Sequence, residues 1–262
     1  MSSKKSINPI VRKIKYLVQI VPLVKNITNW YQIPLFLIFP SRQVILKLKT
    51  GEKFKISHYL DALTIKEIFI DGDYNTPSIN HKTIIDIGAN IGTFSILQAK
   101  LNPLAKIFSF EPDHKTFSMF IENIKLNKLN NIKTFKLGIA GSAGTRVFYS
   151  HPASGLSSLS KKRSGMIKNK IKTITLADIF KNNKLTRCDF FKMDCEGAEY
   201  EILFNTPGKI FKKIDKLVIE YHDALTQYTH KELKDFLKQK GYKVKLIPHS
   251  LETDIGIIFA KR

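Results

Sequence analysis

The chain has 262 residues, of which 43% are hydrophobic, and a formal net charge of +21 at pH 7. This length accommodates a full hydrophobic core plus an appendage, and the composition is that of a globular protein. So basic a chain is expected either to contact an anionic partner or to carry a solvated basic surface. The two cysteines, Cys188 and Cys195, exclude a disulfide framework and a cysteine-based metal site. They indicate a reducing compartment, and we expect a cytoplasmic protein.

Residues 1–50 differ from the rest because they hold nine basic residues and no acid. Apolar residues between positions 10 and 21 recur at helical spacing, which predicts a basic amphipathic helix. Two interpretations remain open. Residues 1–25 either contact an anionic membrane, at its inner face, or pack on the rest of the protein. The apolar run 31–40 contains two prolines and is too short to cross a bilayer, so no transmembrane segment is expected.

The next residues predict a hairpin and a helix. Strands at 44–49 and 53–56 flank a Thr-Gly-Glu turn, and residues 61–69 have a helical pattern. We therefore expect a basic N-terminal appendage over residues 1–80, with the hairpin and helix covering the ligand site of a second unit, residues 81–262.

The stretch Thr83–Ser95 predicts a buried strand, a tight turn and the start of a helix. A β-branched run leads into Asp86, and Gly88 and Gly92 follow. Glycines allow the backbone to approach a ligand, and the free N–H groups of a helix start can bind it. Glu111 ends the next apolar run, and an acid placed roughly 20 residues after the glycines binds ribose hydroxyls in nucleotide-binding folds. The sequence thus predicts a Rossmann-like nucleotide site.

Two residues indicate which nucleotide. In dinucleotide sites a glycine makes room for pyrophosphate, and Asn90 stands at that place. Asp86 would repel phosphates and would suit a cationic amino-acid group. S-adenosylmethionine (SAM) carries an ammonium, a sulfonium and a ribose but no phosphate, so we expect SAM as the cofactor.

Strand and helix patterns alternate from residue 83 onward, which is typical of an α/β fold with a mostly parallel sheet and helices on both faces. Thr229 and Glu232 form a capping box for a helix that ends at Gly241. A terminal antiparallel strand pair follows. The predicted strands are 83–87, 105–110, 131–137, 145–149, 189–193, 216–220, 243–247 and 255–260.

The residues on either side of the fourth of these strands lack a clear period. Gly138–Gly144 is predicted to be a glycine-rich turn. A basic stretch from Ser154 through Lys172 is predicted to be a loop, which either grips a phosphate-bearing substrate or is simply solvated.

Polar residues gather where two later strands end. Asp194 and Glu196 follow one strand, and Glu220 and His222 end the next. In open α/β sheets ligands bind at this edge. Methyl transfer to a hydroxyl requires a base, and the four residues are our catalytic candidates, with Asp194 and His222 both open as that base. Mutual repulsion among the three acids is expected to raise the pKa of one toward neutrality.

Other roles are open for the same residues. Asp194 could cap the helix that begins near Ala198, and Glu196 and Glu199 could be acids favoured at a helix start. Asp194, Glu220 and His222 could also bind a divalent metal, although we assign no metal ligand.

Together these segments resemble the FkbM family of SAM-dependent methyltransferases. The resemblance is carried by T-I-I-D-I-G-A-N-I-G-T-F-S at 83–95, by Phe110-Glu111-Pro112, by K-M-D-C-E-G-A-E at 192–199 and by Glu220-Tyr221-His222. It covers roughly residues 52–262 and leaves the first 50 residues unmatched. It implies a Rossmann-like class I methyltransferase fold and, most often in the family, O-methylation of a sugar or other hydroxyl on a glycan, glycolipid or natural product.

By position, the resemblance implies one set of SAM contacts and one set of acceptor contacts, which share Asp194. The expected SAM contacts are Asp86, Gly88, Ala89, Asn90, Gly92, Thr93, Glu111, Pro112 and Asp194. The residues that would face the acceptor are Asp194, Glu196 and His222, to which we add Glu220.

We therefore expect an O-methyltransferase whose hydroxyl-bearing acceptor is a glycan or lipid-linked glycan. The charge of +21 motivates one alternative, a nucleic-acid methyltransferase. That alternative is disfavoured because Asp194-Cys195-Glu196-Gly197 stands where amino-methylating enzymes carry Asn/Asp-Pro-Pro-aromatic. A further alternative is a non-catalytic basic module that docks on membranes.

Overall fold

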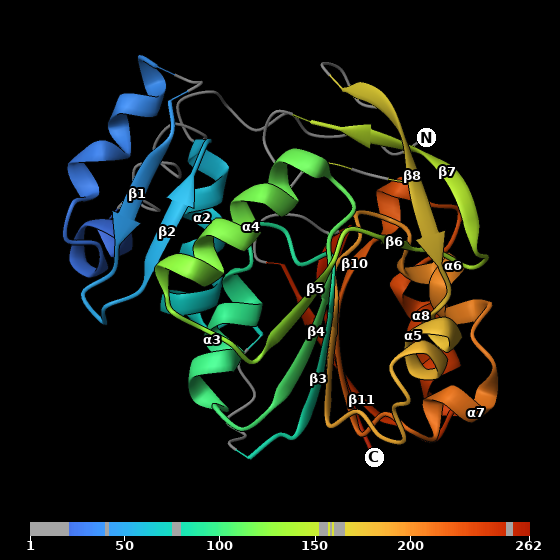
Figure 1. Cartoon of the computed structure of the whole chain (residues 1–262). Helices are drawn as coiled ribbons and strands as arrows, with labels where there is room; N and C mark the ends of the chain where they lie inside the picture. Colours follow the sequence, from blue (N-terminus) through green and yellow to red (C-terminus); the bar gives the residue numbers. More distant parts are fainter. Residues whose placement is uncertain are drawn as a thin grey trace.

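The computed structural model describes residues 21–39, 42–74, 80–151, 157, 159, 166–249 and 254–262. At its centre lies a seven-stranded sheet with the order β11-β12-β10-β9-β3-β4-β5 (Figure 1). Within this sheet β12 runs in the direction opposite to that of the other strands. The strands are β3 (Thr83–Ile87), β4 (Lys106–Phe110), β5 (Ile132–Phe135), β9 (Phe190–Met193), β10 (Lys216–His222), β11 (Lys243–Pro248) and β12 (Ile255–Lys261).

Helices cover both faces of this sheet. In Figure 1 the helices α3 and α4 lie on one side, and α5, α6, α7 and α8 on the other. Their bounds are α3 (Thr93–Leu101), α4 (His114–Leu126), α5 (Leu176–Asn182), α6 (Glu199–Phe204), α7 (Gly208–Phe211) and α8 (His230–Gln239), with the 3-10 turn η5 (Asp223–Leu225) before α8. The predicted α/β fold, with a mostly parallel sheet and antiparallel C-terminal strands, is confirmed.

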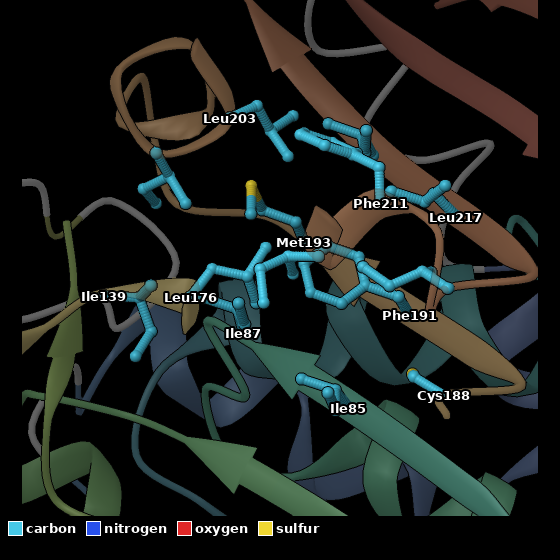
Figure 2. Packing of buried hydrophobic residues seen from close by; sticks show 14 of the residues in the cluster. Ile85, Ile87, Ile139, Leu176, Cys188, Phe191, Met193, Leu203, Phe211 and Leu217 are labelled. Atoms are coloured by element: carbon cyan, nitrogen blue, oxygen red, sulfur yellow. The ribbon is translucent and has the colours of Figure 1, made fainter. Parts of the chain in front are cut away.

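The core follows from the two central strands, in which every residue except Thr83 is buried and most are apolar. Ile85 and Ile87 of β3 and Phe191 and Met193 of β9 point to the face covered by α6 and α7, where Phe211 packs against them (Figure 2). Apolar runs without alternation are expected for parallel strands buried on both faces. The predicted capping box of Thr229 is also confirmed at the start of α8.

The N-terminal residues pack beside α4. The predicted hairpin is confirmed as β1 (Val44–Lys47) and β2 (Lys53–Ile56), and the predicted helix as α2 (Tyr59–Lys66), which continues into the short π-helix η3 (Glu67–Asp71). Residues 21–26 are helical, and the 3-10 turns η1 (Trp30–Gln32) and η2 (Pro34–Leu37) follow. Most of the predicted amphipathic helix at 10–21 lies outside the described residues.

Side-chain amides of α4 hold the hairpin. Asn123 accepts a hydrogen bond from the N–H of Lys55 and donates to its carbonyl, and Asn127 bonds the backbone of Lys53 in the same way. Apolar residues of the hairpin share one core cluster with Ile91, on the loop before α3. The proposed boundary near residue 80 stays a prediction, because the segments on its two sides are packed together.

Two expectations for the middle of the chain were wrong. Part of the basic stretch is a strand, β8 (Ile167–Ile174), which pairs along its whole length with β7 (Gly144–Ser150). Gly138 and Ile139, predicted to be in a turn, form β6, which completes this three-stranded sheet. The lysines of β8 point to solvent while its backbone bonds β7, so pairing with a distant segment overrides a composition that suggests a loop.

The sheet order creates a switch point between β3 and β9. From β3 the chain continues to β4 on one side, whereas β9 lies on its other side and continues to β10. Ligands in open α/β sheets bind at such a point, beyond the carboxyl ends of the strands. None of the described helices is both long and apolar enough to cross a membrane.

Candidate active site

The loop after β3 is fitted tightly against the end of β9. Gly88 has a φ of +74°, and a Cβ there would lie 1.7 Å from the backbone oxygen of Asp194. Gly92 has a φ of +91°, and a Cβ there would meet the ring of Phe120. Neither position tolerates a side chain, so both glycines of the pattern serve the packing that forms the loop.

Glu111 fixes this loop to the next strand. Its carboxylate accepts hydrogen bonds from the backbone N–H of Asn90, at 2.9 Å, and of Asp113, at 2.8 Å. Burial raises the pKa of Glu111 to about 8, and the two N–H donors oppose that rise. Each carboxylate oxygen keeps a further lone pair for another donor, such as a ribose hydroxyl.

A first cavity lies beside Glu111, and we call it the nucleotide cavity. Glu111, Pro112, Leu137 and Leu159 contribute to its wall. The side-chain oxygen of Asn90, which also lines it, is buried and has no hydrogen-bond partner among the described residues. An acceptor without a partner in a buried site suits a ligand that brings N–H or O–H donors.

A second cavity of about 200 Å³ adjoins the first. Glu67, Tyr74, Lys192, Glu220 and His222 are among the residues that line it, and we call it the acidic cavity. It is smaller than the roughly 300–1,000 Å³ of pockets that enclose drug-sized ligands. Four residues line both cavities, namely Gly88, Asn90, Asp194 and Glu196.

The expected SAM residues divide between these places. Gly88, Asn90, Glu111, Pro112 and Asp194 line the nucleotide cavity. Ala89 and Thr93 line the acidic cavity instead, and Asp86 and Gly92 line neither. The structure therefore places most of the expected SAM residues along the two cavities, whereas Asp86 is buried and lines neither.

Asp86 is completely buried and bonded to protein groups. Its carboxylate accepts a hydrogen bond from the hydroxyl of Ser95 at 2.6 Å and lies 3.4 Å from the ammonium of Lys192. Lys192 also donates to the carbonyl of Gly88 at 2.8 Å and lies 3.8 Å from Asp194. This buried ammonium thus joins both loops of the site, and although its burial opposes the charge, the neighbouring carboxylates raise its pKa.

Two acids of the acidic cavity, Glu220 and Glu67, have raised pKa values. Burial, followed by the charge of Asp194, raises the pKa of Glu220 to about 7, and the hydroxyl of Tyr74 donates to the Glu220 carboxylate. This agrees with the expectation that one of the clustered acids would titrate near neutrality. Burial and the charge of Glu220 also raise the pKa of Glu67, to about 8.

His222 is held from behind by Glu199. The Nδ1 atom of His222 lies 3.3 Å from the Glu199 carboxylate, whose oxygens accept the backbone N–H groups of Cys195 and Gly197. Nε2 lies 3.9 Å from Glu196. Burial opposes the imidazolium, but the charges of Glu199 and Glu196 outweigh it and raise the pKa of His222 well above its usual value. Both carboxylates thus favour the protonated form of His222.

The alternative roles can now be compared. Asp194 does not cap the following helix, because the side chain that accepts the loop's N–H groups is that of Glu199. Asp194, Glu199 and His222 are close enough together to bind one metal ion. The carboxylate of Glu199 also holds the loop through the N–H groups of Cys195 and Gly197, and we assign no metal to the site.

Four residues of the site were not assigned a role from the sequence. Lys192 and Glu199 belong to the K-x-D-x-E-G-x-E stretch. Both are ionisable residues within an otherwise buried segment, and this is the sequence feature that could have identified them. Glu67 and Tyr74 come from outside the nucleotide-binding pattern, and no local signal marks them. Glu67 begins η3 and Tyr74 follows it, and residues of α2 and η3 also line the acidic cavity. The hairpin lines neither cavity, and the expectation that the hairpin and helix cover the nucleotide site stays a prediction.

Comparison with known proteins agrees with this geometry. The family model for the methyltransferase FkbM domain matches residues 86–244, which run from Asp86 in β3 to the start of β11. The chain belongs to the FkbM methyltransferase family. The resemblance found in the sequence is confirmed, and the protein is a methyltransferase.

Relatives and solved structures support the same family. The chain is 26% identical over 223 residues to methyltransferase sdnD of Sordaria araneosa, covering 73% of this chain and 85% of that protein. It is 25% identical over 200 residues to methyltransferase 1 of Beauveria bassiana, covering 68% and 80%. The crystal structure of methyltransferase FkbM from Methylobacillus flagellatus has the same fold, with a TM-score of 0.51, 16% identity and coverage of 75% of this chain and 47% of that one.

The buried pair of Lys192 and Asp86 gives a stability prediction. Lys192→Met leaves the Asp86 carboxylate buried without its cation, and we expect the free energy of unfolding to fall by about 3–5 kcal/mol. Adding Asp86→Asn removes the unpaired charge and should restore part of that loss. Urea denaturation of both variants measures this. A Lys192→Met protein as stable as the wild type would contradict the assignment.

Proposed function

We propose that this FkbM-family enzyme transfers the methyl group of SAM to a hydroxyl group of its acceptor. The observation that carries the proposal is the contact between two unlike cavities. The nucleotide cavity and the acidic cavity meet at Gly88, Asn90, Asp194 and Glu196. Such an arrangement brings a cofactor and an acceptor together from opposite sides.

The residues of the nucleotide cavity fit SAM. The free lone pairs of Glu111 suit the ribose hydroxyls, and the unpartnered oxygen of Asn90 suits an N–H or O–H donor. Asp194 and Glu196 provide negative charge near the junction, which favours a cationic ligand over a phosphate. Bound SAM would supply an electrophilic methyl group on a sulfonium.

The acidic cavity fits an acceptor rich in hydroxyl groups. Carboxylates accept hydrogen bonds from hydroxyls, and Glu67, Asp194, Glu196 and Glu220 line this cavity. Its small volume suits one reacting sugar ring of a larger molecule. A nucleic-acid acceptor is disfavoured because its phosphates would be repelled by these charges. We propose a glycan or lipid-linked glycan at the inner face of a membrane, which residues 1–25 would contact.

A carboxylate serves as the base in this proposal. The hydroxyl becomes a good nucleophile when its proton is removed, and Asp194 lines both cavities where the hydroxyl would meet the methyl group. Glu220, with a pKa of about 7, lies close enough to Asp194 to feel its negative charge. The raised pKa of His222 favours Asp194 over His222 as base, because an imidazolium cannot accept a proton. His222 would instead position Glu196 and donate to an acceptor oxygen.

We expect Asp194→Asn to abolish turnover and to leave SAM binding within a few fold of the wild type. Loss of a general base costs about 10²–10⁴ in rate, whereas the backbone contact of residue 194 with Gly88 is kept. Methyl transfer from labelled SAM to a panel of glycolipids and glycans, with a binding titration, measures both. Glu201→Gln, on a more distant part of α6, is the control. Full activity of Asp194→Asn would exclude Asp194 as the base.

The pKa of Glu220 sets a pH prediction. Below about pH 7 the carboxylate becomes protonated. The negative charge of Glu220, which supports Asp194 as the base, is then lost. We therefore expect kcat/KM to fall about tenfold for each pH unit below 7. In Glu220→Gln this limb of the pH profile should disappear, leaving a lowered kcat/KM that changes little between about pH 6 and 8, because glutamine does not titrate and carries no charge. An unchanged limb in Glu220→Gln would show that another group controls it.

A further inference from the structure

The surface around the N-terminal hairpin exposes large apolar side chains. Relative exposure is 59% for Tyr31, 67% for Ile38 and 55% for Phe39, and Trp30 and Ile45 are also exposed. Single apolar residues on a surface are ordinary, but these come from one short segment and its adjoining strand. The neighbouring apolar residues of the hairpin point inward to the core instead.

Cations lie beside two of these side chains, Tyr31 and Ile45. Tyr31 and Ile45 line an open groove of about 870 Å³ together with Arg42, Lys47 and Lys125, and we call it the hairpin groove. The acid that lines it, Glu122, is paired with Lys55 at 2.7 Å. In the part of the chain that the structure describes, no carboxylate pairs with Arg42, Lys47 or Lys125.

The first acid of the sequence, Glu52, does not offset this charge. Its side chain is buried and bonded to Lys100 at 2.8 Å. The surface from η1 to β1 is therefore cationic and apolar at once. This combination is what a peripheral protein presents to an anionic bilayer, where aromatic rings enter the headgroup region and lysine and arginine bind lipid phosphates.

We propose that Trp30, Tyr31, Ile38, Phe39 and the hairpin groove form the face by which the protein docks on an anionic lipid bilayer. The inference deepens the proposed function, because α2 follows the hairpin directly and lines the acidic cavity, so docking would place a lipid-linked acceptor near its site. A second copy of the chain is a poor occupant, since it carries the same charge of +21. Ile38 cannot stack on bases, which favours lipid over nucleic acid.

Co-sedimentation of the full chain with vesicles tests this proposal. We expect binding to vesicles of equal parts phosphatidylcholine and phosphatidylglycerol, and much weaker binding to phosphatidylcholine alone. Arg42→Gln with Lys47→Gln should weaken binding about fivefold for each cation removed. The matched control is Lys209→Gln with Lys212→Gln, which removes two exposed cations around α7, on the opposite flank of the molecule (Figure 1).

A second pair of variants tests the apolar part. Ile38→Ser with Phe39→Ser should weaken binding to the anionic vesicles about tenfold or more, whereas Leu104→Ser, at another highly exposed apolar residue, should not. Titration of each variant with S-adenosylhomocysteine should match the wild type. That readout separates failure of the docking face from failure of the proposed reaction.

Three results would overturn the proposal. One is wild-type protein that binds neutral and anionic vesicles alike or does not bind. Another is equal binding by the Arg42/Lys47 variant and its control, which would assign the contact to residues outside this face. The third is binding of single-stranded RNA, lost in the Arg42/Lys47 variant, without any vesicle binding, which would make the groove a nucleic-acid surface.

Discussion

The site depends on one buried ammonium at the switch point of the sheet. Lys192 lies between Asp86 on β3 and Asp194 after β9, and it also donates to the carbonyl of Gly88. The loops that carry the two cavities are thus joined at a single charged group. Burying such a group is costly without partners, and here the partners are the same residues that form the site. Gly88 completes the arrangement because any side chain there would collide with Asp194.

Positive and negative charges are concentrated in different parts of this protein. The chain as a whole is strongly basic, yet the acidic cavity is lined by Glu67, Asp194, Glu196 and Glu220. Burial and the charge of Asp194 raise the pKa of Glu220, whereas the charges of Glu199 and Glu196 raise that of His222. A carboxylate that titrates near neutrality suits the proposed proton removal from a hydroxyl. The basic surface at the hairpin lines neither cavity.

Sequence patterns predicted the fold better than the site. The strand–turn–helix at residue 83 and the capping box at Thr229 are local signals, and both were confirmed. Strand β8 was not predicted because it forms by pairing with β7, and the lysine-rich sequence of β8 contains no local signal for that pairing. Asp86 was expected to face the cofactor, but the direction of a side chain from a central strand depends on its neighbours, and Lys192 and Ser95 hold it inside. Glu67 and Tyr74 reach the site through packing alone.

The most direct test of the account is calorimetric titration of the protein with S-adenosylhomocysteine. We predict affinity on the order of micromolar for this product and none for NAD. Glu111→Ala should weaken binding by about tenfold or more, since the hydrogen bonds of its carboxyl group to the ribose hydroxyls are lost, while Glu122→Ala, at an exposed position of α4, should bind as the wild type does. A thermal melt of each variant confirms that it is folded. Wild-type protein without affinity, or a folded Glu111→Ala variant with full affinity, would contradict the assignment of the nucleotide cavity.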